Sequence, residues 1–177
     1  MSHLRPAFTL LALFTLLLGL AYPLAMTGLA GLAFPWQAGG SPVTAQDRVV
    51  GSALLGQAFT RPGYFHPRPS AGGHDPMASG GSNLGPTSQK LIDRIAAEAA
   101  PGIAADAVTT SASGLDPDIS RANALAQVAR VAAARGLPPE TVRALVEARA
   151  QGRLWGLIGE PRVNVLALNL ALDAVSR

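Results

Sequence analysis

Two polar segments hold most of the residue types in this sequence that could carry chemistry. The first reads SGGSNLG from Ser79 to Gly85, ahead of an expected helix. Consecutive backbone amides in such a glycine-rich setting can cradle an anion. The run lacks the Gly-Lys-Ser/Thr ending of a P-loop, so a tight turn is the alternative. Its candidate residues for contact with a nucleotide or a partner protein are Ser79, Gly80, Gly81, Ser82, Asn83 and Gly85.

The second segment reads SASGLDPDIS from Ser111 to Ser120. It is rich in side chains that stabilise turns and cap helices, and an aspartate before a proline is an ordinary turn start. Like the first segment, it could instead be a surface that contacts a partner. Its candidate binding residues are Ser111, Ser113, Gly114 and Asp116.

Two other sites could be assembled from the same part of the chain. A hydrolase would need Ser79 or Ser113 as nucleophile, His66 or His74 as base, and Asp116 to orient the base. Their spacing does not resemble a strand, sharp turn and helix that present a serine. A metal could be held by His66, His74 and Asp75, but a glycine-rich loop lacks the fixed geometry of a helical ligand pair. We predict neither catalytic residues nor a metal site.

An uncharged run from Pro6 to Gln46 stands at the start of the chain, and its block from Ala7 to Phe34 is apolar. That block exceeds the roughly 20 residues that a helix needs to cross a bilayer. A signal peptide has an apolar region of about 7 to 15 residues, so a cleaved signal and a buried core helix are the weaker alternatives. We predict a membrane-spanning helix over residues 7–36, kinked near Pro23, with Trp36 at the interface.

The charges that flank the span favour one orientation. Arg5 and the amino terminus precede it, whereas Asp47 and Arg48 follow it. By the positive-inside rule, we predict that residues 1–6 are a short cytoplasmic N-terminus and that everything after Phe34 lies outside the cytoplasm. Labelling at a position such as Ser176 would test this side.

Composition limits the partners of this 177-residue chain. After the span there is room for one modest domain. The 14 basic residues are 13 arginines and Lys90, spread along the chain and nearly balanced by 11 acidic residues. This balance gives no argument for nucleic acid or for a polybasic lipid-binding patch. The absence of cysteine excludes disulfides and thiol catalysis.

The remaining chain predicts a hinge over residues 37–48 and a small α/β (α+β) domain over residues 49–177. A loose alternation from Val49 to Leu55 suggests a strand, and the segment 60–86, dense in Pro and Gly, predicts an ordered loop rather than a helix or a long strand. We expect a helix from Thr87 or Ser88 to about Ala99 that ends at Pro101 and Gly102, a helix from the Ser120 cap to Gly136, and a third from Pro139 to Gly152. The last two should form a hairpin. Arg162–Leu170 is apolar on both faces, which predicts a buried central strand, with a helical tail after Leu168 as the alternative.

Several long blocks resemble one family in order along nearly the whole chain. They are LGLAYPLAMTGLAGLAFPWQAGGS from Leu18, GSALLGQAFTRPGYFHPRPSA from Gly51, ASGGSNLGPTS from Ala78, SASGLDPDIS from Ser111 and GEPRVNVLALNLALD from Gly159. These blocks are similar to the C subunit of the bacterial Kdp-type potassium-transporting ATPase. The family commonly has a histidine in the block from Leu115 to Ser120, where this chain has Asp118, so no histidine role carries over.

The resemblance implies a single-pass subunit of a bacterial inner-membrane complex. Its partners would be a channel-like potassium-translocating subunit, a P-type ATPase subunit and a small single-span subunit, besides membrane lipid. The chain itself would hydrolyse nothing, and ATP would be bound by the partner subunit. The family is described as assisting assembly and as raising the affinity of the catalytic subunit for ATP.

Orientation and ATP affinity are in tension, because a domain outside the cytoplasm cannot touch ATP bound inside it. We therefore expect any effect on ATP to pass through subunit packing. The main alternative is a nucleotide-contacting chaperone with a cytoplasmic soluble domain. An ATP analogue would then photolabel that domain, and Gly81→Val would abolish the labelling. A third alternative, a secreted hydrolase, would lose activity on substitution of Ser79 or His66.

Overall fold

The structure, a computed structural model, describes residues 3–98 and 102–175. The chain divides between Pro42 and Val43 into two compact units, which we describe separately. Ala99 and Pro101, at the predicted end of one helix, and Ser176 lie outside the described residues.

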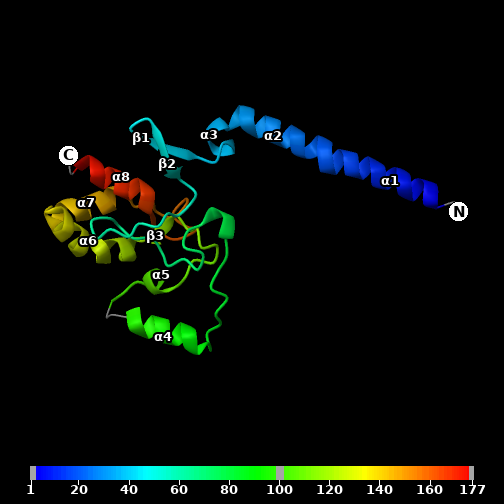
Figure 1. The fold of residues 1–177 in the computed structure, drawn as a ribbon. Coiled ribbons are helices and arrows are strands. Elements are labelled where there is room, and N and C mark those ends of the chain that lie inside the picture. The colour runs from blue at the N-terminus through cyan, green and yellow to red at the C-terminus, as the bar shows by residue number, and fades with distance from the viewer. Residues whose placement is uncertain (1–2, 99–101, 176–177) are drawn as a thin grey trace. The chain divides into compact units, whose positions relative to one another are not determined.

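The N-terminal unit is helical. Helix α1 (Leu4–Leu16), a π-helical turn (Leu17–Ala21) and α2 (Tyr22–Ala33) form one continuous helix, followed by the short α3 (Pro35–Ala38) (Figure 1). An 18-residue window within residues 4–33 has a mean hydropathy of 2.0. By length and composition, this helix is therefore a candidate membrane span. This agrees with the predicted single N-terminal span.

Proline 23 explains the π-helical turn. Proline has no N–H, and its ring clashes with the carbonyl four residues earlier, so a regular helix is disturbed just before it. Here the Tyr22 N–H bonds the Leu17 carbonyl oxygen, five residues back, instead of the one four residues back. The helix therefore widens locally, with one extra residue in this turn, and does not break. The disturbance predicted near Pro23 is thus a π-helical turn.

The second unit begins with a two-stranded hairpin, β1 (Pro42–Ala45) and β2 (Arg48–Ser52). Its turn residues, Gln46 and Asp47, have φ angles of 52° and 59°. Positive φ at both central residues defines the type I′ turn that matches the twist of paired strands. Residues 42–47 of the segment predicted as a hinge thus form the first strand and turn of this hairpin, and Arg48 begins its second strand.

The other described elements of this unit are mostly helices. Strands β3 (Asp118–Ser120) and β4 (Arg162–Asn164) pair antiparallel, with Ile119 opposite Val163. The helices are α4 (Gln89–Glu98), α5 (Ala105–Val108), α6 (Arg121–Arg135), α7 (Pro139–Arg149) and α8 (Val165–Val175), and residues 76–78 form a single 3₁₀ turn.

The predicted helical hairpin is confirmed. The Ser120 hydroxyl oxygen accepts a hydrogen bond from the Asn123 N–H and so caps α6. Gly136, with φ of 64°, ends that helix in the left-handed conformation that glycine adopts at low cost. Pro139 opens α7, which ends at Arg149, three residues before the predicted Gly152.

The prediction of a central strand over Arg162–Leu170 is wrong. Only Arg162–Asn164 is extended, and α8 begins at Val165. The Asn164 side-chain oxygen accepts from the Ala167 N–H and caps the helix. Val165, Leu168 and Leu172 then recur at helical spacing and are buried. A run that is apolar on both faces suits a buried helix as well as a buried strand, and the cap decides between them.

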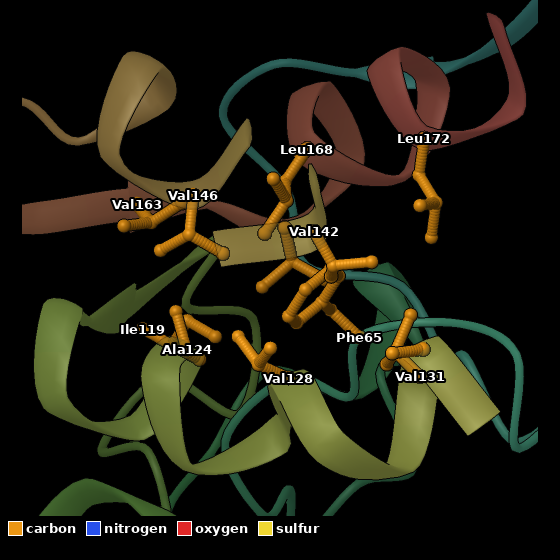
Figure 2. Close-up of a cluster of buried hydrophobic side chains, with 12 residues drawn as sticks. Phe65, Ile119, Ala124, Val128, Val131, Val142, Val146, Val163, Leu168 and Leu172 are labelled. Atoms are coloured by element: carbon orange, nitrogen blue, oxygen red, sulfur yellow. The ribbon is translucent and has the colours of Figure 1, made fainter. Parts of the chain in front are cut away.

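The core lies where α6, α7 and α8 meet (Figure 2). Val128 and Val131 come from α6, Val142 and Val146 from α7, and Leu168 and Leu172 from α8. All six are at most 2% exposed. The side chain of Phe65 lies among them although it belongs to the proline-rich loop, and it is 0% exposed. One aromatic side chain from that loop therefore completes the core.

Candidate functional site

The two polar segments of the sequence lie side by side. We call residues 79–85 the glycine loop and residues 111–118 the serine loop. The Gly80 N–H donates to the Ser113 carbonyl oxygen at 2.9 Å, and the Ser79 hydroxyl donates to the same oxygen at 3.0 Å. The structure thus brings together candidate residues that are more than thirty positions apart in the sequence.

The serine loop is also held by its own side chains. The Gly114 N–H lies 3.1 Å from the Ser111 hydroxyl oxygen, and the Leu115 N–H lies 3.1 Å from that of Ser113. The Ser70 hydroxyl donates to the Gly114 carbonyl oxygen at 2.7 Å. The loop is therefore a folded turn with internal bonds, as its composition predicts.

Glycine is required at position 114 for two reasons. Its φ angle is +70°, where side chains with a Cβ are disfavoured, and a Cβ there would lie 2.8 Å from the Gly80 carbonyl oxygen. Gly81 is packed less tightly, since a Cβ would lie 3.1 Å from the Ala112 carbonyl oxygen. Close approach of the two loops therefore depends on these missing side chains.

Asp116 is held by an arginine. The Arg68 guanidinium donates to one of its carboxylate oxygens at 2.9 Å, and the other accepts from the Asp118 N–H at 3.1 Å. Both residues line two surface hollows of about 330 and 510 Å³. Both groups remain partly exposed, at 26% and 30% of the side chain, so solvent weakens the pair.

Carboxylates gather at the smaller hollow. Asp106, Asp116, Asp118 and Glu160 line it together with Arg68 and Arg162. Burial raises the pKa of Asp118, although hydrogen bonding from Asn164 and the charge of Arg162 oppose that rise. Asp118 is thus an acid with an arginine partner, Arg162, 3.1 Å away.

The pKa of Asp106 shifts in the opposite direction, downward. Burial by itself would raise the pKa of this carboxyl, but three hydrogen bonds to its carboxylate outweigh burial and lower the pKa. The donors are the Ser120 N–H, the Ser120 hydroxyl and the Asn123 side-chain amide, at 2.7, 2.7 and 3.1 Å. The ionised carboxylate therefore fastens α5 to the start of α6.

The predicted site residues do not all meet. Ser79, Gly80 and Gly81 contact the serine loop, which holds Ser111, Ser113, Gly114 and Asp116. No bond in the described part of the chain joins Ser82, Asn83 or Gly85 to that loop. Asn83 and Gly85 are exposed, and Asn83 has a positive φ of 54°.

The serine, histidine and aspartate side chains considered for a hydrolase have other partners. The Ser79 hydroxyl donates to a backbone carbonyl, and Asp116 binds Arg68. His66 Nε2 donates to the Arg61 carbonyl oxygen at 3.1 Å, and burial lowers the pKa of this imidazole. Within residues 3–98 and 102–175, no cluster of three or more histidine and carboxylate side chains is placed to hold a metal.

A feature that sequence reasoning missed is the way the loop around Phe65 is held. The Asn169 amide accepts from the Phe65 N–H at 2.8 Å and donates to the Phe65 carbonyl oxygen at 3.0 Å. The Gln127 amide bonds the N–H and carbonyl oxygen of His66 in the same manner, at 2.7 and 3.1 Å. Two side-chain amides thus take the place of a neighbouring strand.

Two arginines extend this arrangement. Arg130 donates to the Pro62 and Tyr64 carbonyl oxygens at 2.6 and 3.0 Å. Arg135 donates to the Gly63 carbonyl oxygen and lies over the Tyr64 ring at 4.5 Å. The predicted ordered loop is therefore ordered by side chains from α6 and α8, which no sequence spacing reveals.

The arrangement is suited to presenting a rigid surface. The polar groups of the two loops mainly bond one another, and the proline-rich loop is fixed to the helical core. Such a surface can dock on a partner with little loss of conformational freedom.

Comparison with known proteins then places the chain. The family model described as K+-transporting ATPase, c chain, matches residues 4–174. A protein of Allorhizobium ampelinum named potassium-transporting ATPase KdpC subunit is 63% identical, with 98% of this chain and 97% of that protein covered. Proteins of the same name from Caulobacter vibrioides and Methylobacterium nodulans are 60% and 54% identical, covering 98% and 99% of this chain and 94% and 98% of theirs.

Proposed function

Since this chain belongs to the C-chain (KdpC) family of K+-transporting ATPases, we propose that it is a non-catalytic accessory subunit of an ATP-driven potassium uptake complex. The observation that carries the proposal is the family match over residues 4–174, which spans both units of the chain. The relatives named above are called subunits of a potassium-transporting ATPase. We infer that the partners of this chain are the potassium-translocating, P-type ATPase and small single-span subunits.

The geometry of the polar loops supports a structural role. The hydroxyl of Ser79 and the carboxylate of Asp116, which a hydrolytic site would use, are engaged in bonds that fold the loops. The Gly80 amide of the anion-binding candidate likewise donates to Ser113. These loops therefore serve as a shaped contact surface.

The unit that starts at Val43 is proposed to lie outside the cytoplasm, on the side where potassium enters. Arg5 before the candidate span supports a cytoplasmic N-terminus. With that orientation, this unit cannot contact ATP, which the catalytic subunit binds inside the cell. Its influence on ATP affinity then acts through the packing of subunits in the membrane.

The experiment compares the ATPase purified through a tag on its catalytic subunit, from cells with and without this chain. Loss of the chain should reduce the recovery of the assembled complex. It should also raise the KM for ATP in the complex that is recovered. Equal recovery and an equal KM would refute the accessory role.

The competing function, direct nucleotide contact by a cytoplasmic unit, gives a different result. An ATP analogue would then photolabel this chain in the complex. Because a Cβ at Gly81 approaches the Ala112 carbonyl oxygen, Gly81→Val also disturbs loop packing. Labelling of the Gly81→Val variant should therefore be compared with labelling of the Gly85→Val variant, because a Cβ at position 85 meets nothing within 4 Å.

A further inference from the structure

The hairpin between α7 and β4 exposes a group of large apolar side chains. Leu154, Trp155, Leu157 and Ile158, which we call the apolar tip, are 58%, 82%, 81% and 58% exposed. Four such side chains within five residues make a contiguous patch rather than a scattered surface. Soluble domains rarely expose patches of this kind unless something binds them.

The backbone of the hairpin holds the apolar tip in place. Leu154 and Ile158 exchange hydrogen bonds of 2.9 and 3.0 Å, and Gln151 and Arg162 exchange a second pair of 2.8 and 3.0 Å. Trp155, which lies between Leu154 and Ile158 in the sequence, has a φ of 53°, an uncommon conformation for a residue with a bulky side chain. A fixed turn that carries a strained tryptophan is an anchor that is already ordered before it binds.

The charges beside the apolar tip indicate what it binds. Arg149 and Arg153 are exposed, and in the described part of the chain neither makes an ion pair. Arg162 differs, since it pairs with Asp118 at 3.1 Å. Glu160 is an acid in the same hairpin, so the local excess of positive charge is small.

This excess is too small for a lipid surface to be the favoured occupant. Attraction of a segment to anionic lipid takes a cluster of about four to eight basic residues. Tryptophan and arginine are instead typical of the few residues that dominate a protein interface. Two unpaired arginines are complementary to acidic side chains around an apolar pocket.

We propose that the apolar tip inserts into an apolar pocket with an acidic rim on another subunit of the K+-transporting ATPase. This inference rests on the function proposed above, which supplies the partner. It assigns an anchoring contact to residues 153–158, in addition to the contact surface of the two polar loops.

Site-specific photocrosslinking in the purified complex tests the contact. A benzophenone side chain is introduced at Trp155 and, as a matched control, at Met77, an apolar residue that is 92% exposed outside the hairpin. Position 155 should crosslink to another protein subunit with at least tenfold higher yield than position 77. Crosslinks to lipid or to a second copy of this chain, or none above the control, would overturn the proposal.

A variant provides the second measurement. Trp155→Ser with Leu157→Ser should speed the dissociation of this chain from the complex about 30-fold, the effect of losing a strong interface residue. The melting temperature of the free chain should stay unchanged, because both side chains are exposed. Unchanged dissociation would overturn the proposal. If even the wild-type chain fails to co-purify with the other subunits, the proposed function fails together with this contact.

Discussion

Replacement of Asn169 by leucine should strongly destabilise the unit that contains α8. Leucine has nearly the same shape, so the core volume is preserved, but both amide groups are lost. Asn169 is 1% exposed, and its amide is bonded to both backbone polar groups of Phe65, which is 0% exposed. The substitution therefore leaves one N–H and one carbonyl buried without a partner.

The magnitude follows from these two groups. A buried polar group without a partner costs about 1–3 kcal/mol, so the free energy of unfolding should fall by about 2–6 kcal/mol. A whole domain is typically stable by about 5–15 kcal/mol, which makes this a large loss. The loop around Phe65 should also open locally and become a substrate for chymotrypsin at Tyr64 and Phe65.

Gln127→Met is the matched control. Gln127 makes the same pair of bonds to His66, but both residues are half-exposed, so water can replace the lost partner. Its cost should stay below about 2 kcal/mol. Urea unfolding of the full chain in detergent, followed by circular dichroism, measures both variants. A loss below about 1 kcal/mol for Asn169→Leu, or an equal loss in the two variants, would refute the reasoning.

The remaining predictions concern the loops and Asp106. Gly114→Ala should lower the free energy of unfolding by about 1–3 kcal/mol, because position 114 has a positive φ and its Cβ would approach the Gly80 carbonyl oxygen. Gly85→Ala is the control and should be nearly neutral. Thermal melts of the two variants measure the difference. Asp106 has a lowered pKa in the folded chain, so the stability it contributes is present above its unfolded pKa of about 4 and is lost as pH falls through the folded pKa. Urea unfolding between about pH 2 and 6 should show this loss in the wild type, and Asp106→Asn should flatten it; an unchanged pH profile would contradict the assignment.

Local signals in the sequence predicted part of this fold correctly. The long apolar N-terminal helix, a candidate span, follows from length and hydropathy, and the helical hairpin follows from the Ser120 cap, the left-handed Gly136 and Pro139 in the first turn. These features depend on residues within one or two turns of each other. Local physical chemistry is enough to place them.

The α8 helix was mispredicted for a local reason as well. Its apolar residues fit a strand and a helix equally well, and only the Asn164 cap distinguishes the two. The strand suggested from Val49 to Leu55 is present in part as β2, but its pairing with β1 was missed because Gln46 and Asp47 adopt positive φ without a glycine to mark the turn.

The candidate site was harder to predict because its contacts are long-range. The pairing of Gly80 with Ser113 and of Phe65 with Asn169 joins segments that are far apart in the chain. No periodicity or motif encodes such a pairing. The composition of the serine loop predicted that it is a folded turn, but not that it packs against the glycine loop.

The measurement that tests the central claim most directly is the side of the membrane on which the second unit lies. The chain has no cysteine, so a single Met77→Cys substitution at a 92% exposed position gives one labelling site. If this chain acts on the ATPase from outside the cytoplasm, a membrane-impermeant maleimide will label the cysteine in intact spheroplasts. Labelling only after the cells are lysed would place the unit in the cytoplasm and contradict the proposed action through subunit packing.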